Sequence, residues 1–370
     1  MFDFPFRPSL LTEPKSYAFN TPQGADYLDC SMGVNPYGYP PEAAEAFRSF
    51  DVTKLADYPH SSVLVTALEN YWAPYAEVTE DRLFFCEGSV SGIYCINNLF
   101  AESERNEVVG FAPAFTDAME SSRRYGMVYR EVPIRLEENG RCAAEDLIAA
   151  LSAKTAFVYV DRPNNPTGQT MPLKDVAALA DASRKVGAWL LVDEAFGDFI
   201  PQDESALTLM KDYDNLFVLR TFSKGFGLPN LRAGYIVSPS EMTRLYWRCS
   251  NPYVLSDLKR SVCAAALKGA AHATAHAGDF VAVKQRIREA VSGSDFYMLQ
   301  TDDRVPIFAL ASRREEDLQA VLLDAGLLTV SGHEFAGLGE QYVRIRIPVE
   351  SQVSRMTETL SALALERKRT

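Results

Sequence analysis

From residue 83 onward, short apolar runs alternate with segments whose apolar residues recur at helical spacing. Short apolar runs bounded by turn residues indicate buried strands, and a spacing of three to four residues indicates amphipathic helices. This predicts strands at 83–86, 108–111, 129–134, 156–160, 189–192, 216–219 and 233–237. Helices are predicted between the earlier strands, at 91–100, 114–125, 144–151 and 172–186. Because strands and helices alternate, we expect an α/β fold with a doubly wound, mainly parallel sheet.

The pattern changes after residue 240, where the helices become longer and fewer strands follow. The later strands are predicted at 305–310 and 342–347. We therefore expect two domains: a large domain of residues 48–248, and a smaller α+β domain made of residues 1–47 and 249–370.

The composition excludes several classes of function. The chain has 370 residues, is 47% hydrophobic and carries a net charge of −12, which argues against binding to nucleic acid or anionic membranes. The six cysteines and four histidines show no metal-ligand spacing, so we expect no metal site. Without an apolar run long enough to span a bilayer and without a signal peptide, we expect a cytoplasmic protein.

Lys224 lies in a loop rich in glycine and proline, together with Thr221, Ser223 and Arg232. A lysine in a desolvated pocket near other cations loses proton affinity and becomes a nucleophilic amine that can form a Schiff base. The two hydroxyls and the guanidinium suit a bound phosphate. The plain alternative is a solvated lysine in a surface loop, and further motifs upstream argue against it.

Those motifs all follow predicted strands. The Gly-Ser turn at 88–92 leads into a helix, where free N–H groups favour a phosphate. Asn165 lies in an Asn-Pro-Thr-Gly turn, and its amide can bind an oxygen on a ligand ring. Asp193 ends a buried strand, where its charge needs a partner such as a protonated ring nitrogen. Phe115 can stack on a flat cofactor. Taken singly, each motif also fits an ordinary turn, helix cap or core aromatic.

Arg344 and Arg346 alternate along one predicted strand, so their side chains point to the same face. Facing inward, they could hold a carboxylate with paired hydrogen bonds. Facing solvent, they would be ordinary charges of an edge strand.

Taken together and in this order, the motifs resemble the class I/II pyridoxal-phosphate-dependent aminotransferases of fold type I, nearest the histidinol-phosphate aminotransferase group. The resemblance implies the cofactor pyridoxal 5'-phosphate, and transfer of an amino group from an amino acid to a 2-oxo acid. It also implies a homodimer with shared active sites, in which Tyr58 reaches the phosphate bound by the neighbouring subunit.

The resemblance also implies roles for single residues. Lys224 would hold the cofactor and move the proton at Cα, and Asp193 would pair with the ring nitrogen. Asn165 would bind the ring oxygen, and Phe115 would stack on the ring. The phosphate would be held by Ser89, Val90, Thr221, Ser223 and Arg232. Arg344 would bind the substrate carboxylate, with Asn35 and Arg346 as further substrate contacts.

Two positions depart from the family pattern. Phe196 stands where many members have a tyrosine whose hydroxyl binds the ring oxygen, and the run 193–199 also resembles threonine-phosphate decarboxylases. Decarboxylation therefore stays open as an alternative. Arg346 stands where small or polar residues are commoner, so it would meet either a second anionic group or a local acid. A non-catalytic regulator domain is less favoured, because no basic helix-turn-helix region precedes it. Asp161 and Arg162 receive no role.

Overall fold

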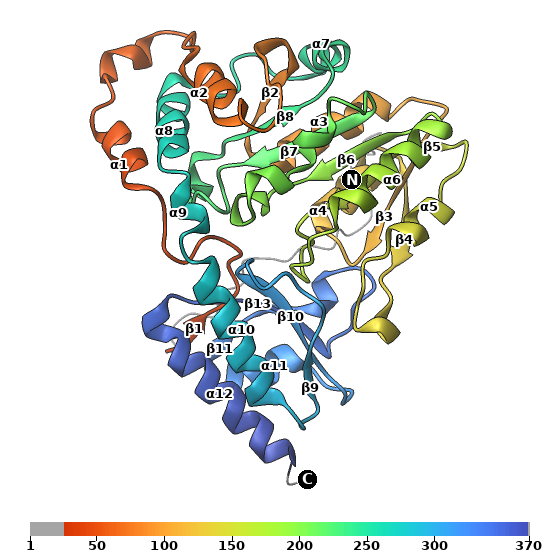
Figure 1. Cartoon of the computed structure of the whole chain (residues 1–370), viewed down its shortest axis with the longest axis vertical. Helices are drawn as coiled ribbons and strands as arrows, with labels where there is room; N and C mark the ends of the chain where they lie inside the picture. The colour runs from red at the N-terminus through yellow and green to blue at the C-terminus, as the bar shows by residue number, and fades with distance from the viewer. Residues whose placement is uncertain (1–25, 369–370) are drawn as a thin grey trace, which may run out of the picture.

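The computed structural model describes residues 26–368, with a large sheet in the upper part of Figure 1 and a smaller one below it. The large sheet contains, in spatial order, β2 (Leu83–Cys86), β8 (Gly234–Val237), β7 (Leu216–Thr221), β6 (Trp189–Asp193), β5 (Thr155–Asp161), β3 (Glu107–Ala112) and β4 (Val128–Pro133). Only β8 runs against its neighbours, and every other pairing is parallel. The predicted α/β fold with a mainly parallel sheet is confirmed.

The order of the strands reverses between β3 and β5. From β3 the chain turns to one side to add β4, and from β5 it turns to the other side to add β6 and β7. In open parallel sheets a crevice forms at such a reversal, beyond the carboxyl ends of the strands. The loops after β3 and β5 therefore border the natural place for a ligand.

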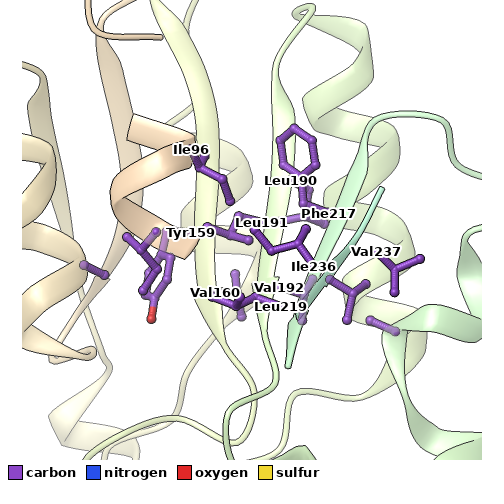
Figure 2. Close-up of a cluster of buried hydrophobic side chains, with 14 of the residues drawn as sticks. Ile96, Tyr159, Val160, Leu190, Leu191, Val192, Phe217, Leu219, Ile236 and Val237 are labelled. Carbon is purple, nitrogen blue, oxygen red and sulfur yellow. The ribbon is translucent and has the colours of Figure 1, made fainter. Parts of the chain in front are cut away.

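The central strands are buried on both faces, as expected for a parallel sheet covered by helices. Figure 2 shows side chains of β5, β6, β7 and β8 packed together, with Ile96 of a covering helix among them. The helices that follow strands of the large sheet are α3 (Gly88–Phe100), α4 (Thr116–Arg124), α5 (Ala144–Ala149), α6 (Leu173–Lys185) and α7 (Ser240–Cys249). The first of them begins three residues before the predicted start at residue 91, so the Gly-Ser motif forms its first turn.

The smaller sheet is antiparallel, with the order β12 (Val330–Ser331), β13 (Tyr342–Arg346), β10 (Ile307–Ser312) and β9 (Phe296–Met298). Helices α10 (Ala277–Val291), α11 (Leu318–Asp324) and α12 (Glu350–Lys368) accompany it. The first and last of these helices lie side by side at the lower left of Figure 1. A second apolar core fills this part of the molecule, and β1 (Leu28–Asp29) pairs in parallel with β11 (Leu327–Leu328) beside it.

Segments of the two predicted domains pack against each other at the upper left of Figure 1. Helix α8 (Asp257–Lys268) contacts α1 (Pro41–Arg48) and α2 (Val63–Trp72). The side chains that α8 buries belong to the same apolar core as the large sheet. A short helix, α9 (Ala271–Thr274), then leads towards the smaller sheet. The domain bounds at 48–248 stay a prediction.

Candidate active site

A cavity of about 620 Å³ lies at the carboxyl ends of the parallel strands, where the strand order reverses. Its opposite wall comes from β12, β13 and residues 31–34. Most of the residues singled out from the sequence line this one cavity: Ser89, Val90, Phe115, Asn165, Asp193, Phe196, Ser223, Lys224, Arg232 and Arg344. Four others, Thr221, Asn35, Tyr58 and Arg346, lie outside its wall.

The backbone of Lys224 is held from two sides. The N–H of Asn35 donates to the carbonyl of Lys224 over 3.0 Å, and the Asn35 side-chain amide donates to the carbonyl of Gly225 over 2.9 Å. On another side Asp198 packs so closely that a Cβ on Gly225 would lie 2.3 Å from the Asp198 Cβ. Asn35, expected among the substrate contacts, is thus placed as a clamp on the lysine loop.

The environment of the Lys224 amine favours its neutral form. Burial lowers the pKa of Lys224 to about 8, helped by the positive charges of Arg344 and Arg232 and opposed by Asp193. The Nζ atom lies 5.5 Å from the centroid of the Phe196 ring. Because a deprotonated amine is nucleophilic, this lysine can attack a carbonyl carbon near neutral pH.

Asp193 presents a buried carboxylate to the same cavity. One oxygen accepts a hydrogen bond from the Tyr159 hydroxyl over 2.9 Å, and the other accepts from the N–H of Ala195 over 3.0 Å. Burial nevertheless raises the pKa of Asp193 to about 6. A positively charged partner in the cavity would restore the ionised form. Sequence reasoning did not single out Tyr159. Its position on β5, the strand that leads into the Asn165 turn, was the one feature that could have pointed to it.

Asp161 bridges the two loops at the reversal of the sheet. Its Oδ2 accepts from the N–H of Phe115 over 3.0 Å and from the N–H of Asn165 over 2.9 Å, and its Oδ1 accepts from the Asn164 amide over 2.8 Å. Burial raises the pKa of Asp161 to about 7. This residue therefore positions both Phe115 and Asn165. Asp161, like Asp193, is a charged residue at the end of an apolar strand, and this feature of the sequence could have pointed to it.

The first turn of α3 and the Lys224 loop form a cradle for an anion. Arg232, at a φ of 48°, donates from Nη2 to the carbonyl of Glu87 over 3.3 Å and from Nη1 to the Ser223 hydroxyl over 3.4 Å. The Thr221 hydroxyl donates a hydrogen bond to the Ser223 hydroxyl over 3.0 Å. A Cβ on Gly88 would lie only 2.4 Å from Nη2 of Arg232, so glycine allows this approach. Free helix N–H groups beside a guanidinium suit a phosphate.

Arg344 and Arg346 point to the same face of β13, towards the N-terminal segment, but only Arg344 reaches the cavity. Arg344 is 3% exposed and donates from Nη1 to the Asn165 side-chain oxygen over 3.0 Å. Its Nη2 donates to the carbonyl of Ser31. Arg346 donates to the main-chain carbonyls of Asp29 and Ile347, over 2.6 and 3.3 Å.

Tyr58 lies on the surface of the chain and is not part of the cavity wall. Its side chain is 70% exposed, and its ring lies 4.8 Å from that of Tyr253. The role expected for Tyr58 requires a second subunit, so it stays a prediction.

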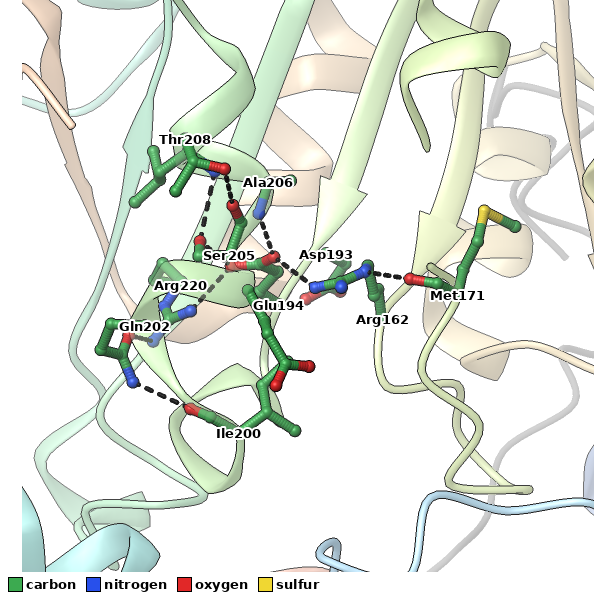
Figure 3. A network of polar contacts seen from close by, with 12 residues as sticks. Arg162, Met171, Asp193, Glu194, Ile200, Gln202, Ser205, Ala206, Thr208 and Arg220 are labelled. Carbon is green, nitrogen blue, oxygen red and sulfur yellow. Dashed lines mark hydrogen bonds and ion pairs between the residues drawn. The ribbon is translucent and has the colours of Figure 1, made fainter. Parts of the chain in front are cut away.

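A buried ionic network lies around Glu194, next to Asp193 of the cavity wall, and Figure 3 shows it. Glu194 accepts from Nη1 of Arg162 over 3.1 Å and from Nη1 of Arg220 over 2.7 Å. It also accepts from the N–H of Ala206 over 2.7 Å and from the Ser205 hydroxyl. Because Arg162 follows β5, Glu194 follows β6 and Arg220 lies on β7, the network ties three strand ends together. No motif pointed to it.

These groups fit pyridoxal 5'-phosphate. The cofactor needs an amine for its carbonyl carbon, an acid for its ring nitrogen and a cradle for its phosphate. The cavity provides Lys224, Asp193 and the turn at Gly88 with Arg232. Phe115 and Asn165 lie in the same wall, within reach of a flat ring bound there.

The chain is similar to known aminotransferases over most of its length. A family model described as aminotransferase class I and II matches residues 25–363. The histidinol-phosphate aminotransferase of Halorubrum lacusprofundi is 28% identical over 348 residues, which cover 92% of this chain and 91% of that protein.

Solved structures share the fold. The histidinol-phosphate aminotransferase of Sinorhizobium meliloti, solved in complex with pyridoxal-5'-phosphate, has a TM-score of 0.80 at 20% identity and covers 98% of both chains. The L-threonine-O-3-phosphate decarboxylase of Porphyromonas gingivalis has a TM-score of 0.77 at 18% identity, over 92% of this chain and 99% of the other. Given the family match and the cavity that fits the cofactor, the chain belongs to the class I and II aminotransferases and is a pyridoxal-phosphate-dependent enzyme of fold type I.

Proposed function

We propose that this aminotransferase takes the amino group of a donor with one anionic group, and that Lys224, Asp193 and Arg344 do the central work. The observation that carries the proposal is their convergence in one cavity at the reversal of the sheet. An amine, a carboxylate and a guanidinium there can bind, activate and orient an amino compound.

Lys224 supplies the nucleophile and the base. When bound, pyridoxal phosphate provides the carbonyl carbon that accepts the amino group, and a ring that stabilises negative charge developing at the substrate Cα. With a pKa of about 8, the Lys224 amine is partly neutral near neutral pH. With cofactor and donor bound, this amine would be the base that takes the proton from the substrate Cα. The ionised Asp193 holds the positive charge of the ring nitrogen.

Arg344 fixes the donor. Its guanidinium, already oriented by Asn165 and by the carbonyl of Ser31, offers its charge to the anionic group beside the amino carbon. Phe196 brings an apolar ring to within 5.5 Å of the lysine amine, and so helps to keep water from the reacting atoms.

We propose histidinol phosphate as the first donor to test. It carries one primary amine and one anionic group, and relatives such as that of Halorubrum lacusprofundi bear the name histidinol-phosphate aminotransferase. The amino acceptor is a 2-oxo acid.

We further propose a homodimer in which Tyr58 reaches the phosphate bound by the second subunit. In support, the segment that precedes it in the sequence exposes large apolar side chains: Phe47, Val52 and Leu55, at 59%, 70% and 64%. Light scattering on the purified protein tests the assembly, and Tyr58→Phe should weaken cofactor affinity without unfolding the subunit. A monomer with full activity would contradict this part. Within residues 26–368, no helix has both the length and the apolarity needed to cross a bilayer.

A single-turnover absorbance experiment tests the reaction type. The holoenzyme is mixed with histidinol phosphate or threonine phosphate without a 2-oxo acid. Amino transfer converts the lysine-bound cofactor into stable pyridoxamine phosphate, and a 2-oxo acid then restores it. Release of carbon dioxide from threonine phosphate with an unchanged cofactor spectrum would mean decarboxylation instead.

A further inference from the structure

Lys284 is a fully buried lysine to which the proposed function gives no role. It lies on α10, outside the wall of the cavity. Its Nζ donates to the Thr301 hydroxyl over 2.8 Å, to the carbonyl of Asp302 over 2.7 Å and to the carbonyl of Ile307 over 3.0 Å. One amine thus gathers three oxygens from both ends of the segment 301–307, which leads into β10.

These contacts can form in either protonation state of Lys284. Burial lowers its pKa to about 7, and the negative charges of Asp303 and Asp302 oppose this shift. The ammonium has three N–H donors for the three oxygens. The neutral amine keeps two N–H groups for the carbonyls, and its lone pair can accept a hydrogen bond from the Thr301 hydroxyl. The contacts therefore persist on both sides of neutral pH.

Two of the three oxygens also pack against Gly168, in the turn that contains Asn165. A Cβ on Gly168 would lie 2.5 Å from the Ile307 carbonyl oxygen and 2.6 Å from the Thr301 hydroxyl oxygen, so glycine allows this approach. The carbonyl of Gly168 also accepts from the N–H of Asp302 over 3.0 Å. The lysine therefore holds the oxygens on which this turn of the large sheet rests.

The strand that begins at Ile307 also supports Arg344. In the pairing of β10 with β13, Ala309 lies opposite Arg344. Arg344 donates to the Asn165 side-chain oxygen over 3.0 Å. The small sheet thus meets the Asn165 turn at two points, at Gly168 and at Asn165 itself. Because both points lie on one short turn, a shift at Gly168 would also move the oxygen that orients Arg344.

Resting on the roles proposed for Asn165 and Arg344, we propose that Lys284 is a positioning residue of the active site. Through the oxygens of Thr301 and Ile307, it holds the turn in the place where Asn165 orients Arg344 towards the donor. Without the amine these oxygens lose their shared donor, and the turn that rests on them loosens. The plain alternative is that Lys284 only anchors α10 in the small domain, which would stabilise the fold without acting on the turn.

Arg288 offers a matched control on the same helix. It lies one turn after Lys284, and its guanidinium donates to the two carboxylate oxygens of Asp303 over 2.8 and 2.6 Å. It thereby ties α10 to the segment 301–307, as Lys284 does. The three atoms nearest to a Cβ on Gly168, however, belong to other residues of that segment. If Lys284 only anchored the helix, Arg288→Met would have the same effects as Lys284→Met.

Hydrogen exchange on the holoenzyme tests the positioning directly. The amides of Asn165 and Gly168 are hydrogen-bonded, so their exchange reports how firmly the turn is held. In Lys284→Met, the peptide covering 162–170 should exchange about threefold or more faster than in the native protein, as for the loss of a hydrogen bond. In Arg288→Met it should exchange at the native rate. Equal exchange of this peptide in the two variants would overturn the inference.

Steady-state kinetics connect the turn to the donor. Lys284→Met should raise KM for histidinol phosphate about threefold or more and leave kcat within about twofold, because donor binding is disturbed. Arg288→Met should change neither constant. A lysine that only stabilised the fold would instead lower kcat, through a smaller folded fraction, at an unchanged KM. An unchanged KM in Lys284→Met would therefore overturn the inference.

A milder variant keeps the test decisive if Lys284→Met does not fold. Thr301→Ala removes one of the three acceptors and its contact with Gly168, so exchange of the turn should again become faster and KM should rise. Native values of both in Thr301→Ala would overturn the inference. The exchange measurement needs no turnover. If no donor is converted, the proposed function fails on its own test, while faster exchange of the turn in Lys284→Met still supports the positioning.

Discussion

Arg344 donates a hydrogen bond to the side-chain oxygen of Asn165 over 3.0 Å, and thereby joins the small sheet to the turn that follows β5 of the large one. The two residues are 179 positions apart in the sequence. We propose a substrate role for Arg344 and a cofactor-ring role for Asn165, and with those roles their contact would couple the two binding functions. A donor that reaches Arg344 meets a guanidinium already oriented by the cofactor side of the cavity.

The first prediction concerns this pair. Arg344→Ala should raise KM for the donor about tenfold or more, because a charged hydrogen-bonding group is lost. Asn165→Ala should also raise KM, by a smaller factor than Arg344→Ala, because the guanidinium keeps its charge and loses one hydrogen bond that orients it. Arg346→Ala is the control on the same strand, since within residues 26–368 Arg346 donates to main-chain carbonyls and lies outside the cavity wall. Steady-state kinetics with histidinol phosphate measure the three KM values. An equal rise in KM for Arg346→Ala would contradict the role of Arg344 as the donor-binding residue.

The second prediction concerns the pH dependence of Lys224. Its pKa of about 8 lies below the ordinary 10.5, so its amine in the apoprotein should react half-maximally with an amine reagent near pH 8. Removing the nearby positive charge in Arg344→Gln should move this midpoint upward, whereas Arg346→Gln should leave it unchanged. Mass spectrometry of the labelled peptide measures the midpoint. A midpoint near 10.5 in the native protein would refute the shift.

The same shift predicts how the stability of the apoprotein depends on pH. Between about pH 8 and 10.5, the unfolded lysine keeps a proton that the native lysine has lost. The free energy of unfolding should therefore rise with pH across this window. Below pH 8 the native protein carries the full destabilisation that comes from burying a charged Lys224. Lys224→Met should remove this part of the pH dependence in urea unfolding. An unchanged slope in that variant would show that other groups cause it.

The third prediction concerns the phosphate cradle. Gly88→Ala should weaken binding of pyridoxal phosphate about tenfold or more, because the new Cβ would lie 2.4 Å from Nη2 of Arg232 and displace a charged donor. Gly38→Ala is the matched control, since Gly38 also has a positive φ but nothing lies within 4 Å of the new Cβ. Both variants place an alanine at a positive φ and so strain the backbone, but only in Gly88→Ala does the new Cβ contact Arg232 of the phosphate cradle. Titration of the apoprotein with cofactor measures the affinities, and equal losses would make strain the cause.

The fourth prediction concerns the buried network of Figure 3. Glu194→Ala should lower the free energy of unfolding by about 3–5 kcal/mol, because it leaves two buried guanidinium groups without their shared carboxylate. Asp181→Asn breaks an exposed pair with Arg184 and should have little effect. Urea denaturation of the apoproteins compares the two. A loss for Glu194→Ala no greater than for the surface variant would show that the guanidinium groups find other partners.

Several features of this protein could be predicted from the sequence because they depend on neighbouring residues. Apolar runs and helical spacing predicted the alternating elements, since burial of one face imposes a local period. The motifs around Gly88, Asn165, Asp193 and Lys224 follow strands. Parallel strands place their carboxyl ends at one edge of a sheet, and this predicted that the motifs would meet. The cofactor and the type of reaction followed from the resemblance that these motifs support.

The tertiary structure decided which residues beside the motifs serve the site. Asn35 clamps the lysine loop, Asp161 bridges two loops, and Arg346 turns to main-chain carbonyls instead of the cavity. Glu194 joins three strand ends, and Lys284 binds oxygens that pack against Gly168 although the two residues are far apart in sequence. Such contacts depend on strand order, on register and on how the small sheet lies against the large one. The local pattern of apolar and polar residues carries none of this information, because the free energy of these contacts comes from groups that only the folded chain brings together.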